Sequence, residues 1–175
     1  MSLGSINLSY SYPNIKGLPI VDVVAKDSHT GEILGKVSAE VSKSAHYNQK
    51  LLSSYIDFKK STDSYELAKP HMYIKDLFVE PSARKRGIGR KLVDCIIGQS
   101  ILKGYNGRVV LLAGNSKEVS PLPFYRKIGF ISGIPGINHQ IDKAIQYRTE
   151  FNNGIQAFMC ATQKAIDRVA KSLRR

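Results

Sequence analysis

The sequence predicts an α/β fold, and two observations lead to this prediction. A strand-like apolar run at residues 72–79 is followed by a glycine turn, a helical pattern at 88–103 and a second strand-like run at 108–114. Strand, turn, helix and strand in this order are typical of a βαβ unit. Residues 20–41 precede this unit and have the pattern of a β-hairpin, so we expect a sheet with flanking helices.

The first half of the chain should begin with this hairpin. Residues 20–25 are rich in β-branched side chains, residues 27–31 supply turn residues, and residues 33–41 form the return strand. Residues 44–68 are polar and less regular, and a helix is expected there over 48–58 because apolar residues recur at helical spacing.

The second half should alternate strands and helices. The strand at 72–79 ends before Pro81, and the helix after it carries a mostly apolar face. The run at 108–114 is short and continuously apolar, which is typical of a strand buried on both faces. The later elements are expected to be a short helix at 124–129, a helix at 138–151 that stops at Asn153 and Gly154, a strand at 156–161 and a basic amphipathic tail at 162–175.

Length and composition narrow the class of protein. The 175 residues allow one domain with a sizeable core. No apolar run approaches the length needed to span a bilayer and the N-terminus lacks a signal-peptide pattern, so we expect no membrane association. Cys95 and Cys160 have no ligand spacing, and neither do the histidines. We therefore expect a cytoplasmic monomer or homodimer without a metal site.

The balance of charge points to an anionic partner. The formal net charge is +12 and the isoelectric point is about 9.7. A phosphorylated cofactor, a nucleic acid or an acidic protein would each be attracted to such a chain. Charge alone does not choose among these partners.

A glycine turn inside a run of cations opens the predicted helix. The amides of such a turn point the same way and form an anion nest, to which the helix dipole adds positive potential, so a diphosphate is the natural guest. The Walker and dinucleotide-binding patterns are absent, and Gly-x-Gly alone fits a tight turn with solvated cations equally well. The residues concerned are Arg84, Lys85, Arg86, Gly87, Ile88, Gly89 and Arg90.

The wider segment YIKDLFVEPSARKRGIGRKLVD, residues 73–94, resembles the central signature of the GNAT superfamily of acyl-CoA N-acyltransferases. That family has a Leu-aromatic-Val strand end, an acid-Pro turn, [QR]-x-x-G-x-[GA] and a helix. A second family segment, FYRKIGF, follows at 124–130. The resemblance is strongest over 72–130. It implies one N-acetyltransferase domain over 1–161, with a GNAT-like mixed, mostly antiparallel central sheet flanked by helices and a splayed parallel pair at the cofactor site. Residues 162–175 would be a basic C-terminal helical tail.

The resemblance also implies acetyl-CoA as co-substrate and assigns roles to individual residues. The backbone of Leu77, Phe78 and Val79 would pair with the pantetheine arm, and an N–H near Val79 would bind the oxyanion. The segment Arg84 to Arg90 would hold the diphosphate, and Asn115 would bond the lower arm of the cofactor. Tyr125 would be the general acid that protonates the leaving thiolate.

A general base is not evident from the sequence. Many relatives carry a glutamate where this chain has Lys75. Strand alternation predicts Lys75, Leu77 and Val79 on one face and Ile74, Asp76 and Phe78 on the other, so Asp76 should not replace that glutamate. Tyr73 would share the face of Lys75 and position a water, whereas His71, Glu80 and Glu118 are expected at the surface.

The leading functional hypothesis is acetyl transfer from acetyl-CoA to a primary amine. The acceptor would be a small amine, a protein lysine or N-terminus, or an aminoacyl-tRNA, and the charge of +12 favours acidic proteins or RNA-borne amines. The alternative is a non-catalytic CoA-binding module or a basic nucleic-acid-binding module. The tail 162–175 is expected to pack on the domain as a solvated amphipathic helix, with RNA contact as the alternative.

Overall fold

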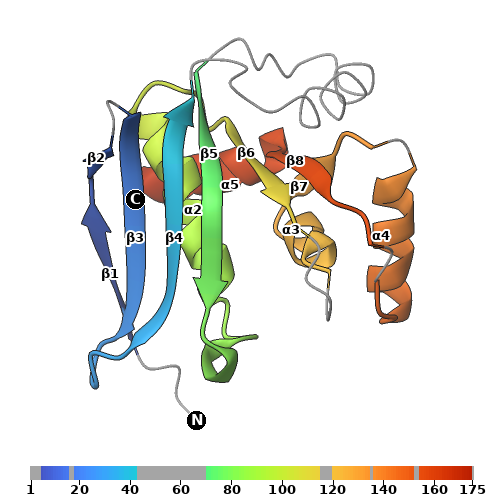
Figure 1. Ribbon diagram of the computed structural model, residues 1–175, viewed down its shortest axis with the longest axis horizontal. Helices are drawn as coiled ribbons and strands as arrows, with labels where there is room; N and C mark the ends of the chain where they lie inside the picture. The colour runs from blue at the N-terminus through green and yellow to red at the C-terminus, as the bar shows by residue number, and fades with distance from the viewer. Residues whose placement is uncertain are drawn as a thin grey trace.

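A mixed β-sheet forms the centre of the structure, a computed structural model that describes residues 5–15, 18–42, 70–114, 120–134, 136–151 and 154–174. Seven strands lie side by side in the order β1-β3-β4-β5-β6-β8-β7, and β2 pairs with β3 outside this row (Figure 1). The strands are β1 (Ile6–Ser11), β2 (Asn14–Ile15), β3 (Leu18–Asp27), β4 (Ile33–Ser42), β5 (His71–Val79), β6 (Val109–Ala113), β7 (Phe130–Ser132) and β8 (Ala157–Ala161).

The pairing of these strands confirms the predicted fold class. Neighbouring strands are antiparallel throughout, except that β5 and β6 run parallel. The predicted hairpin is formed by β3 and β4, whose pairing runs from Ile20 opposite Glu40 to Lys26 opposite Ile33. The helix expected over 48–58 lies outside the described residues.

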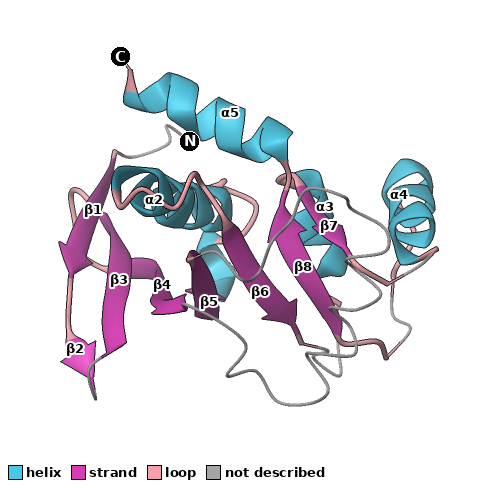
Figure 2. Ribbon diagram, turned by 90° about the horizontal axis from the view of Figure 1, so that it is seen from above, coloured by secondary structure: helices cyan, strands magenta, loops and turns pink. Residues whose placement is uncertain are grey.

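Helix α2 connects the two parallel strands, as a βαβ unit requires. It lies between the sheet and α5 (Figure 2), which explains why its buried residues are spread over two sides. Gly98 forms part of the contact, because a Cβ there would lie 3.7 Å from Val169 of α5. The described helices are α2 (Ile88–Leu102), α3 (Leu122–Lys127), α4 (Ile137–Tyr147) and α5 (Gln163–Leu173), and a 3₁₀ turn covers Pro81–Ala83.

Helix α5 packs the basic tail against the rest of the protein. The Thr162 hydroxyl caps its first turn and donates to the carbonyl oxygen of Gly129 at 2.7 Å. Arg168 donates to the carbonyl oxygen of Ile128 at 3.1 Å and forms an ion pair with Asp94 at 2.6 Å. One central cation of the tail is therefore bound within the protein and is not available to a partner.

Two predictions for the C-terminal third were wrong in detail. Helix α4 ends at Tyr147 instead of continuing to 151, because Arg148 adopts a left-handed conformation with φ of 54°. Strand β7 was not predicted at all, since three residues are too short to show an alternating pattern. The final strand β8 gives β7 its hydrogen-bonding partner by lying between β6 and β7.

The turn between α2 and β6 offers a stability test. Gly107 has φ of 73°, and a Cβ there would lie 2.6 Å from Cγ2 of Ile166 on α5. Gly107→Ala should therefore add overpacking of about 1–3 kcal/mol to the strain of a left-handed residue. Gly104 has φ of 77° and open space around its Cβ position, so Gly104→Ala should add the strain alone. Denaturant unfolding of both variants measures the difference, and equal losses would contradict the contact with α5.

Within the described ranges, none of the helices combines the length and the apolar character that a membrane-spanning helix needs. These residues also contain no group of three or more His, Cys, Asp or Glu side chains placed to hold a metal ion. Cys95 and Cys160 are free thiols, and burial raises the pKa of both, which keeps them protonated and weakly reactive.

Candidate functional site

The parallel strands β5 and β6 separate after a short stretch of pairing. Met72, Tyr73 and Ile74 pair with Val109, Val110 and Leu111 in turn, and the remaining residues of β5 have no partner on β6. The two strands visibly diverge below this point (Figure 1). In the described part of the chain, one edge of the second half of β5 is therefore open along the residues that were predicted to bind the pantetheine arm.

The backbone of β5 presents hydrogen-bonding groups to this open edge. The amide of Glu80 donates to the carbonyl oxygen of Leu34 at 3.0 Å, so it points to β4. Because successive residues of a strand direct their N–H and C=O groups to opposite sides, Val79 and Leu77 direct theirs away from β4. An extended ligand lying beside β5 would meet these groups as a further strand would.

A β-bulge at Lys75 corrects the predicted arrangement of side chains on β5. Ser38 pairs with Asp76 and Ala39 pairs with Ile74, so Lys75 is the extra residue of its strand. The bulge shifts the alternation by one, which puts Ile74 on the α2 side with Leu77 and Val79. The prediction that Ile74 shares a face with Asp76 and Phe78 was therefore wrong.

The other face of β5 and β4 carries the polar residues near the opening. Tyr73, Asp76 and Phe78 share this face because their partners on β4 alternate. Lys75 forms an ion pair with Glu40 at 3.3 Å, where Glu40 is the partner of Tyr73 across the strands. Lys75 stands where many relatives carry a glutamate, so this position holds a cation. The Glu40 carboxylate on β4 neutralises that cation.

The loop between β5 and α2 has the geometry of an anion-binding turn. Lys85 and Gly87 adopt left-handed conformations, with φ of 62° and 78°. The first bond of α2 runs from the amide of Lys91 to the carbonyl oxygen of Gly87 at 3.1 Å. The amides of Lys85 to Arg90 bond to no other described residue, as expected at a helix start. This loop can therefore offer successive N–H groups to an anion.

The cations of this loop are not equivalent. Arg84 and Lys85 are exposed, and Nε of Arg84 donates to the carbonyl oxygen of Val79 at 3.3 Å. Arg86 is partly buried. Arg90 forms an ion pair with Asp94 at 3.8 Å, one turn along α2, so part of its charge is already matched within the helix.

The second glycine of the turn is required for packing. A Cβ at Gly89 would lie 3.0 Å from the Phe124 ring on α3 and 3.5 Å from Val79 on β5. The Phe124 ring in turn lies edge-on to Tyr125, with ring centroids 5.0 Å apart. Gly89 thus allows the loop, the end of β5 and α3 to meet, a contact that no pattern in the sequence predicts.

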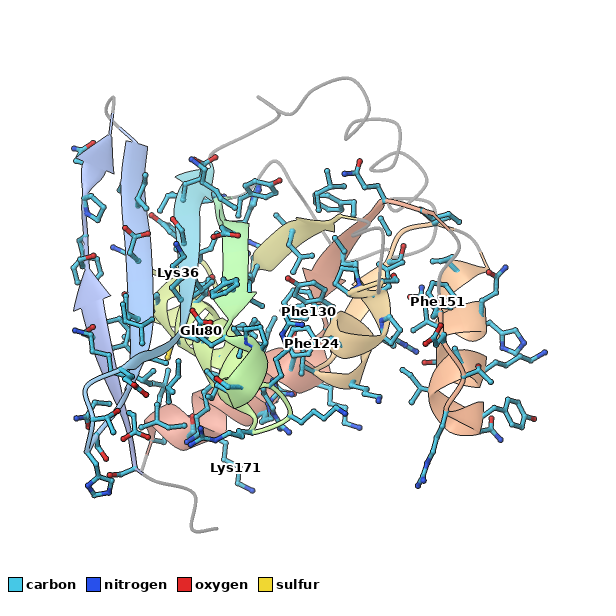
Figure 3. The ribbon with its side chains drawn as sticks, turned by 60° about the horizontal axis from the view of Figure 1, so that its bottom comes forward. Lys36, Glu80, Phe124, Phe130, Phe151 and Lys171 are labelled. Atoms are coloured by element: carbon cyan, nitrogen blue, oxygen red, sulfur yellow. The ribbon has the colours of Figure 1, made fainter. Side chains whose placement is uncertain are left out.

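Tyr125 lies at the meeting point of these elements. Its side chain is 8% exposed, and its ring packs against the rings of Phe124 on α3 and Phe130 on β7, both labelled in Figure 3. Burial, and secondarily the Asp76 carboxylate, raise the pKa of Tyr125 to about 12. The phenol oxygen bonds to no described residue. The raised pKa keeps the hydroxyl protonated, so it can donate a hydrogen bond.

The structure places the other candidate residues as follows. His71, expected at the surface, is 0% exposed, so that expectation was wrong: residue 71 begins the buried part of β5. Glu80 is partly buried at the end of β5. Asn115 and Glu118 lie outside the described residues, and their predicted positions remain predictions.

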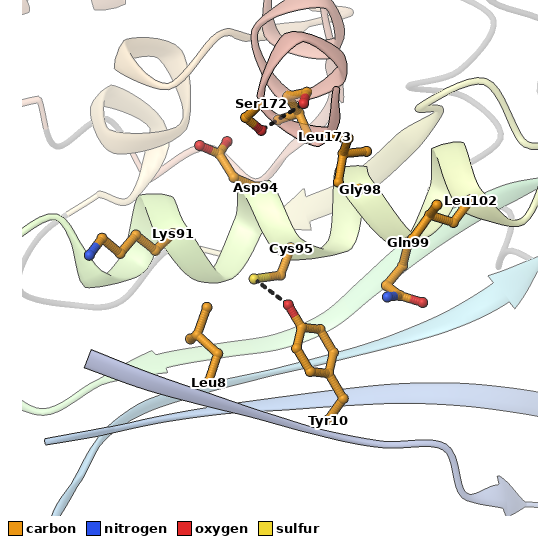
Figure 4. A pocket seen from close by; sticks show the side chains of 11 residues that line it. Leu8, Tyr10, Lys91, Asp94, Cys95, Gly98, Gln99, Leu102, Ser172 and Leu173 are labelled. Atoms are coloured by element: carbon orange, nitrogen blue, oxygen red, sulfur yellow. Dashed lines mark hydrogen bonds between the residues drawn. The ribbon is translucent and has the colours of Figure 1, made fainter. Parts of the chain in front are cut away.

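A separate cavity of about 270 Å³ lies between β1, α2 and α5 (Figure 4). Two of the residues that line it form a hydrogen bond, in which the hydroxyl of Tyr10 donates to the sulfur of Cys95 at 3.2 Å. Burial is the main reason that the pKa of Tyr10 is raised, so neither group supplies a nucleophile at neutral pH. None of the residues that line this cavity is a predicted site residue.

Comparison with known proteins identifies the kind of fold. Residues 23–132 match the acetyltransferase (GNAT) domain family. The fold resembles that of a bacterial toxin (14% identity, TM-score 0.53, covering 89% of this chain and 73% of that one). It also resembles arylalkylamine N-acetyltransferase 2 from Aedes aegypti (14% identity, TM-score 0.51, covering 81% and 72%). A putative arylalkylamine N-acetyltransferase 7 from the same mosquito is similar too (15% identity, TM-score 0.50, covering 79% and 62%).

Proposed function

The chain belongs to the GNAT family of acetyltransferases, and from this premise we propose that it transfers the acetyl group of acetyl-CoA to a primary amine. The observation that carries the proposal is the conjunction of three features at one place. These are the open edge of β5, the turn that follows it, and the buried Tyr125, whose ring packs on the Phe124 ring beside Gly89 of that turn.

The proposed pose of acetyl-CoA uses backbone groups for most of its contacts. The pantetheine arm lies along β5, where Leu77 and Val79 direct N–H and C=O groups to the open side. The diphosphate lies on the amides that follow Arg84, where the dipole of α2 adds positive potential. Since the turn follows β5 directly, one extended cofactor reaches both.

In this pose the thioester carbonyl lies near the amide of Val79, which stabilises the oxyanion as the amine attacks. The new C–N bond forms as the C–S bond breaks, the nitrogen releases one proton to solvent water, and the departing thiolate of CoA takes up a proton from the same solvent. With a pKa of about 12 for Tyr125 and about 8.5 for a thiol, complete transfer from phenol to thiolate is uphill by roughly 5 kcal/mol. We therefore infer that Tyr125 acts through a hydrogen bond that strengthens as negative charge develops on the sulfur.

The acceptor is proposed as a class only. The similar structures are named as a bacterial toxin and as an arylalkylamine N-acetyltransferase. Because proteins described so differently share one fold, the fold does not identify the acceptor. The net charge of +12 disfavours polycationic acceptors and favours amines carried by acidic proteins or RNA. Small monoamines remain compatible with this charge, because an anionic cofactor would neutralise part of it.

Thermal unfolding and thiol release test the proposal together. Acetyl-CoA at 100 times its Kd should stabilise the protein by about 2.7 kcal/mol, seen as a higher Tm. Acetyl-CoA with a panel of primary amines should also release free thiol, detected with a thiol-reactive dye. Stabilisation without release for any amine indicates a CoA-binding module without turnover. Absence of both indicates that the chain does not use acetyl-CoA.

A further inference from the structure

Strand β1 ends the row of strands and has a free edge. It pairs with β3 on one side, and no other described strand pairs with it (Figure 1). Natural proteins usually protect such an edge with charged residues, prolines or β-bulges. The sequence of β1, INLSYS, contains no charged residue and no proline, and its pairing with β3 runs without a bulge. The edge is thus suited to pairing with a further strand.

The backbone of β1 alternates between β3 and the free edge. The residue before it, Ser5, accepts a hydrogen bond from the amide of Ser28 at 3.0 Å, so the backbone of Ser5 points to the β3 side. Because successive residues of a strand direct their N–H and C=O groups to opposite sides, Ile6, Leu8 and Tyr10 direct theirs to the free edge. Each of these residues offers one donor and one acceptor to a partner.

The same residues carry the apolar side chains of β1. Ile6 and Leu8 pack against the core, and Leu8 and Tyr10 line the cavity between β1, α2 and α5 (Figure 4). Leu102 of α2 and Leu173 of α5 line this cavity too, and they are 69% and 47% exposed. The free edge thus borders an apolar surface that a strand added beside β1 would cover.

We propose that β1 pairs with β1 of a second copy of the chain in antiparallel orientation, which joins the two sheets into one. The two-fold axis passes beside Leu8, so Leu8 lies opposite Leu8 of the second copy, and Ile6 lies opposite Tyr10 of the second copy. The opposed residues are those whose backbone groups face outward, so each pair exchanges two hydrogen bonds. This interaction surface does not depend on whether the chain uses acetyl-CoA.

The proposed register matches side chains of one kind on each face of the joined sheet. On the side of α2, Leu8 meets Leu8 and Ile6 meets the ring of Tyr10, which is a favourable cross-strand pair. On the other face, the exposed Asn7 meets the exposed Ser9 of the second copy, and both are polar. A shift by one residue would oppose outward-facing backbone groups to groups that already point to β3, so the hydrogen bonds would be lost.

The area and charge of this surface predict a weak dimer. A standard interface covers about 800 Å² of each partner, and the exposed parts of Tyr10, Tyr12, Leu102 and Leu173 supply roughly half of that area. The net charge of +12 on each copy opposes association, whereas β1 itself adds no charge to the contact. Since β1 carries no cation, an acidic strand would gain less here than a second uncharged β1. Added salt should strengthen the dimer, because it screens the repulsion.

Sedimentation of the wild-type protein tests the association. Analytical ultracentrifugation should show a monomer at about 1 µM and mostly dimer at roughly 500 µM, as an interface of this size implies. Raising the ionic strength from about 0.05 M to about 0.5 M should lower the dissociation constant about threefold or more. A protein that stays monomeric at every concentration, or a dimer that salt weakens, would overturn the proposal.

Hydrogen exchange locates the contact without any substitution. In the dimer the amides of Leu8 and Tyr10 are bonded to the second copy, so NMR should show their exchange slowing several-fold as the protein concentration rises. The amides of Asn7 and Ser9 point to β3 in both states and should exchange at a constant rate. If the protein dimerises while the exchange of Leu8 and Tyr10 does not slow, the interface lies elsewhere and the proposal is wrong.

Opposite charges at Leu8 test the position of the two-fold axis. Leu8→Lys and Leu8→Asp each place like charges directly opposite each other in the dimer, so each variant alone should dimerise about tenfold more weakly than the wild type. Mixed in equal amounts, the two variants should associate with each other about fivefold more tightly than either associates with itself, because unlike charges are then opposed. No preference for the mixed pair would contradict the proposed axis.

Gln140 provides the matched control for these variants. It is exposed on α4, which lies beyond β7 at the end of the sheet away from β1 (Figure 1). Gln140→Lys and Gln140→Asp change the net charge by the same amounts, and each should dimerise like the wild type, alone or mixed. An equal preference for mixed pairs at both positions would show that net charge alone governs association, against the proposal. If the Leu8 variants do not fold, the exchange measurement on the wild-type protein decides.

Discussion

Tyr125→Phe should lower kcat roughly 100- to 1,000-fold while changing the Kd for acetyl-CoA by less than about twofold. The phenol oxygen bonds to no described residue and the ring is held by Phe124 and Phe130, so phenylalanine should fill the same space. What disappears is the hydrogen bond to the leaving sulfur. Steady-state kinetics give kcat, and calorimetry with acetyl-CoA gives Kd.

Tyr147→Phe is the control for this substitution. Tyr147 lies at the end of α4 with 66% of its surface exposed, so the loss of its hydroxyl should affect neither parameter. A Tyr125→Phe variant with wild-type kcat would remove Tyr125 from the mechanism. A variant with equally weakened binding would show that the hydroxyl supports the cofactor site and not the chemistry.

The raised pKa of Tyr125 also predicts how stability depends on pH. The pKa is about 12 in the folded protein and about 10 in the unfolded chain, so folding favours the protonated phenol. This contribution is complete below pH 10 and is lost as the pH rises towards 12. Unfolding free energies measured over this window should therefore fall less in Tyr125→Phe than in the wild-type protein.

The second large effect concerns the diphosphate. Acetyl-pantetheine, which lacks the diphosphate and the nucleotide, should bind about a hundredfold or more weakly than acetyl-CoA, because it makes no contact with the turn after β5. Arg84→Ala combined with Arg86→Ala should weaken acetyl-CoA binding by about ten- to a hundredfold. The same double variant should leave acetyl-pantetheine binding nearly unchanged. Calorimetry with both ligands measures the two affinities.

A double variant on α5 controls for total charge. Lys171→Ala with Arg174→Ala removes the same two charges from exposed positions and should leave acetyl-CoA binding unchanged. If both double variants weaken acetyl-CoA binding equally, the net positive charge of the whole protein attracts the cofactor, and the turn does not bind the diphosphate. If acetyl-pantetheine binds as tightly as acetyl-CoA, the proposed pose is wrong.

Elements with long, regular patterns were predicted well from the sequence. Helix α2 and strand β5 agree with their predicted bounds to within one residue, because each has a continuous apolar pattern and a clear end signal. The failures were local. Arg148 ends α4 through a left-handed conformation that arginine rarely adopts, and the bulge at Lys75 reverses the alternation of its strand. Neither feature has a residue signature, so neither could be read in advance.

The candidate site divides in the same way. The turn, its cations and Tyr125 were proposed as site residues because motifs of fixed spacing carry them. Their roles remain predictions, as does the role of Asn115, which lies outside the described residues. The pairing of Lys75 with Glu40 was not foreseen, since it depends on the register between β5 and β4. Strand alternation correctly put Asp76 on the face of Phe78, but it put Ile74 there too, and the bulge moves Ile74 to the face of Leu77 and Val79.

The sequence by itself determined the family, the α/β class and the residues of the turn, because these depend on the order and spacing of residues along the chain. Only the tertiary structure decided which side chains meet. The contact of Gly89 with Phe124 and the ion pair between Arg168 and Asp94 join segments that are 35 or more residues apart. Such contacts follow from strand register and helix packing, which minimise buried voids and unpaired groups over the whole fold and leave no trace in any short stretch of sequence.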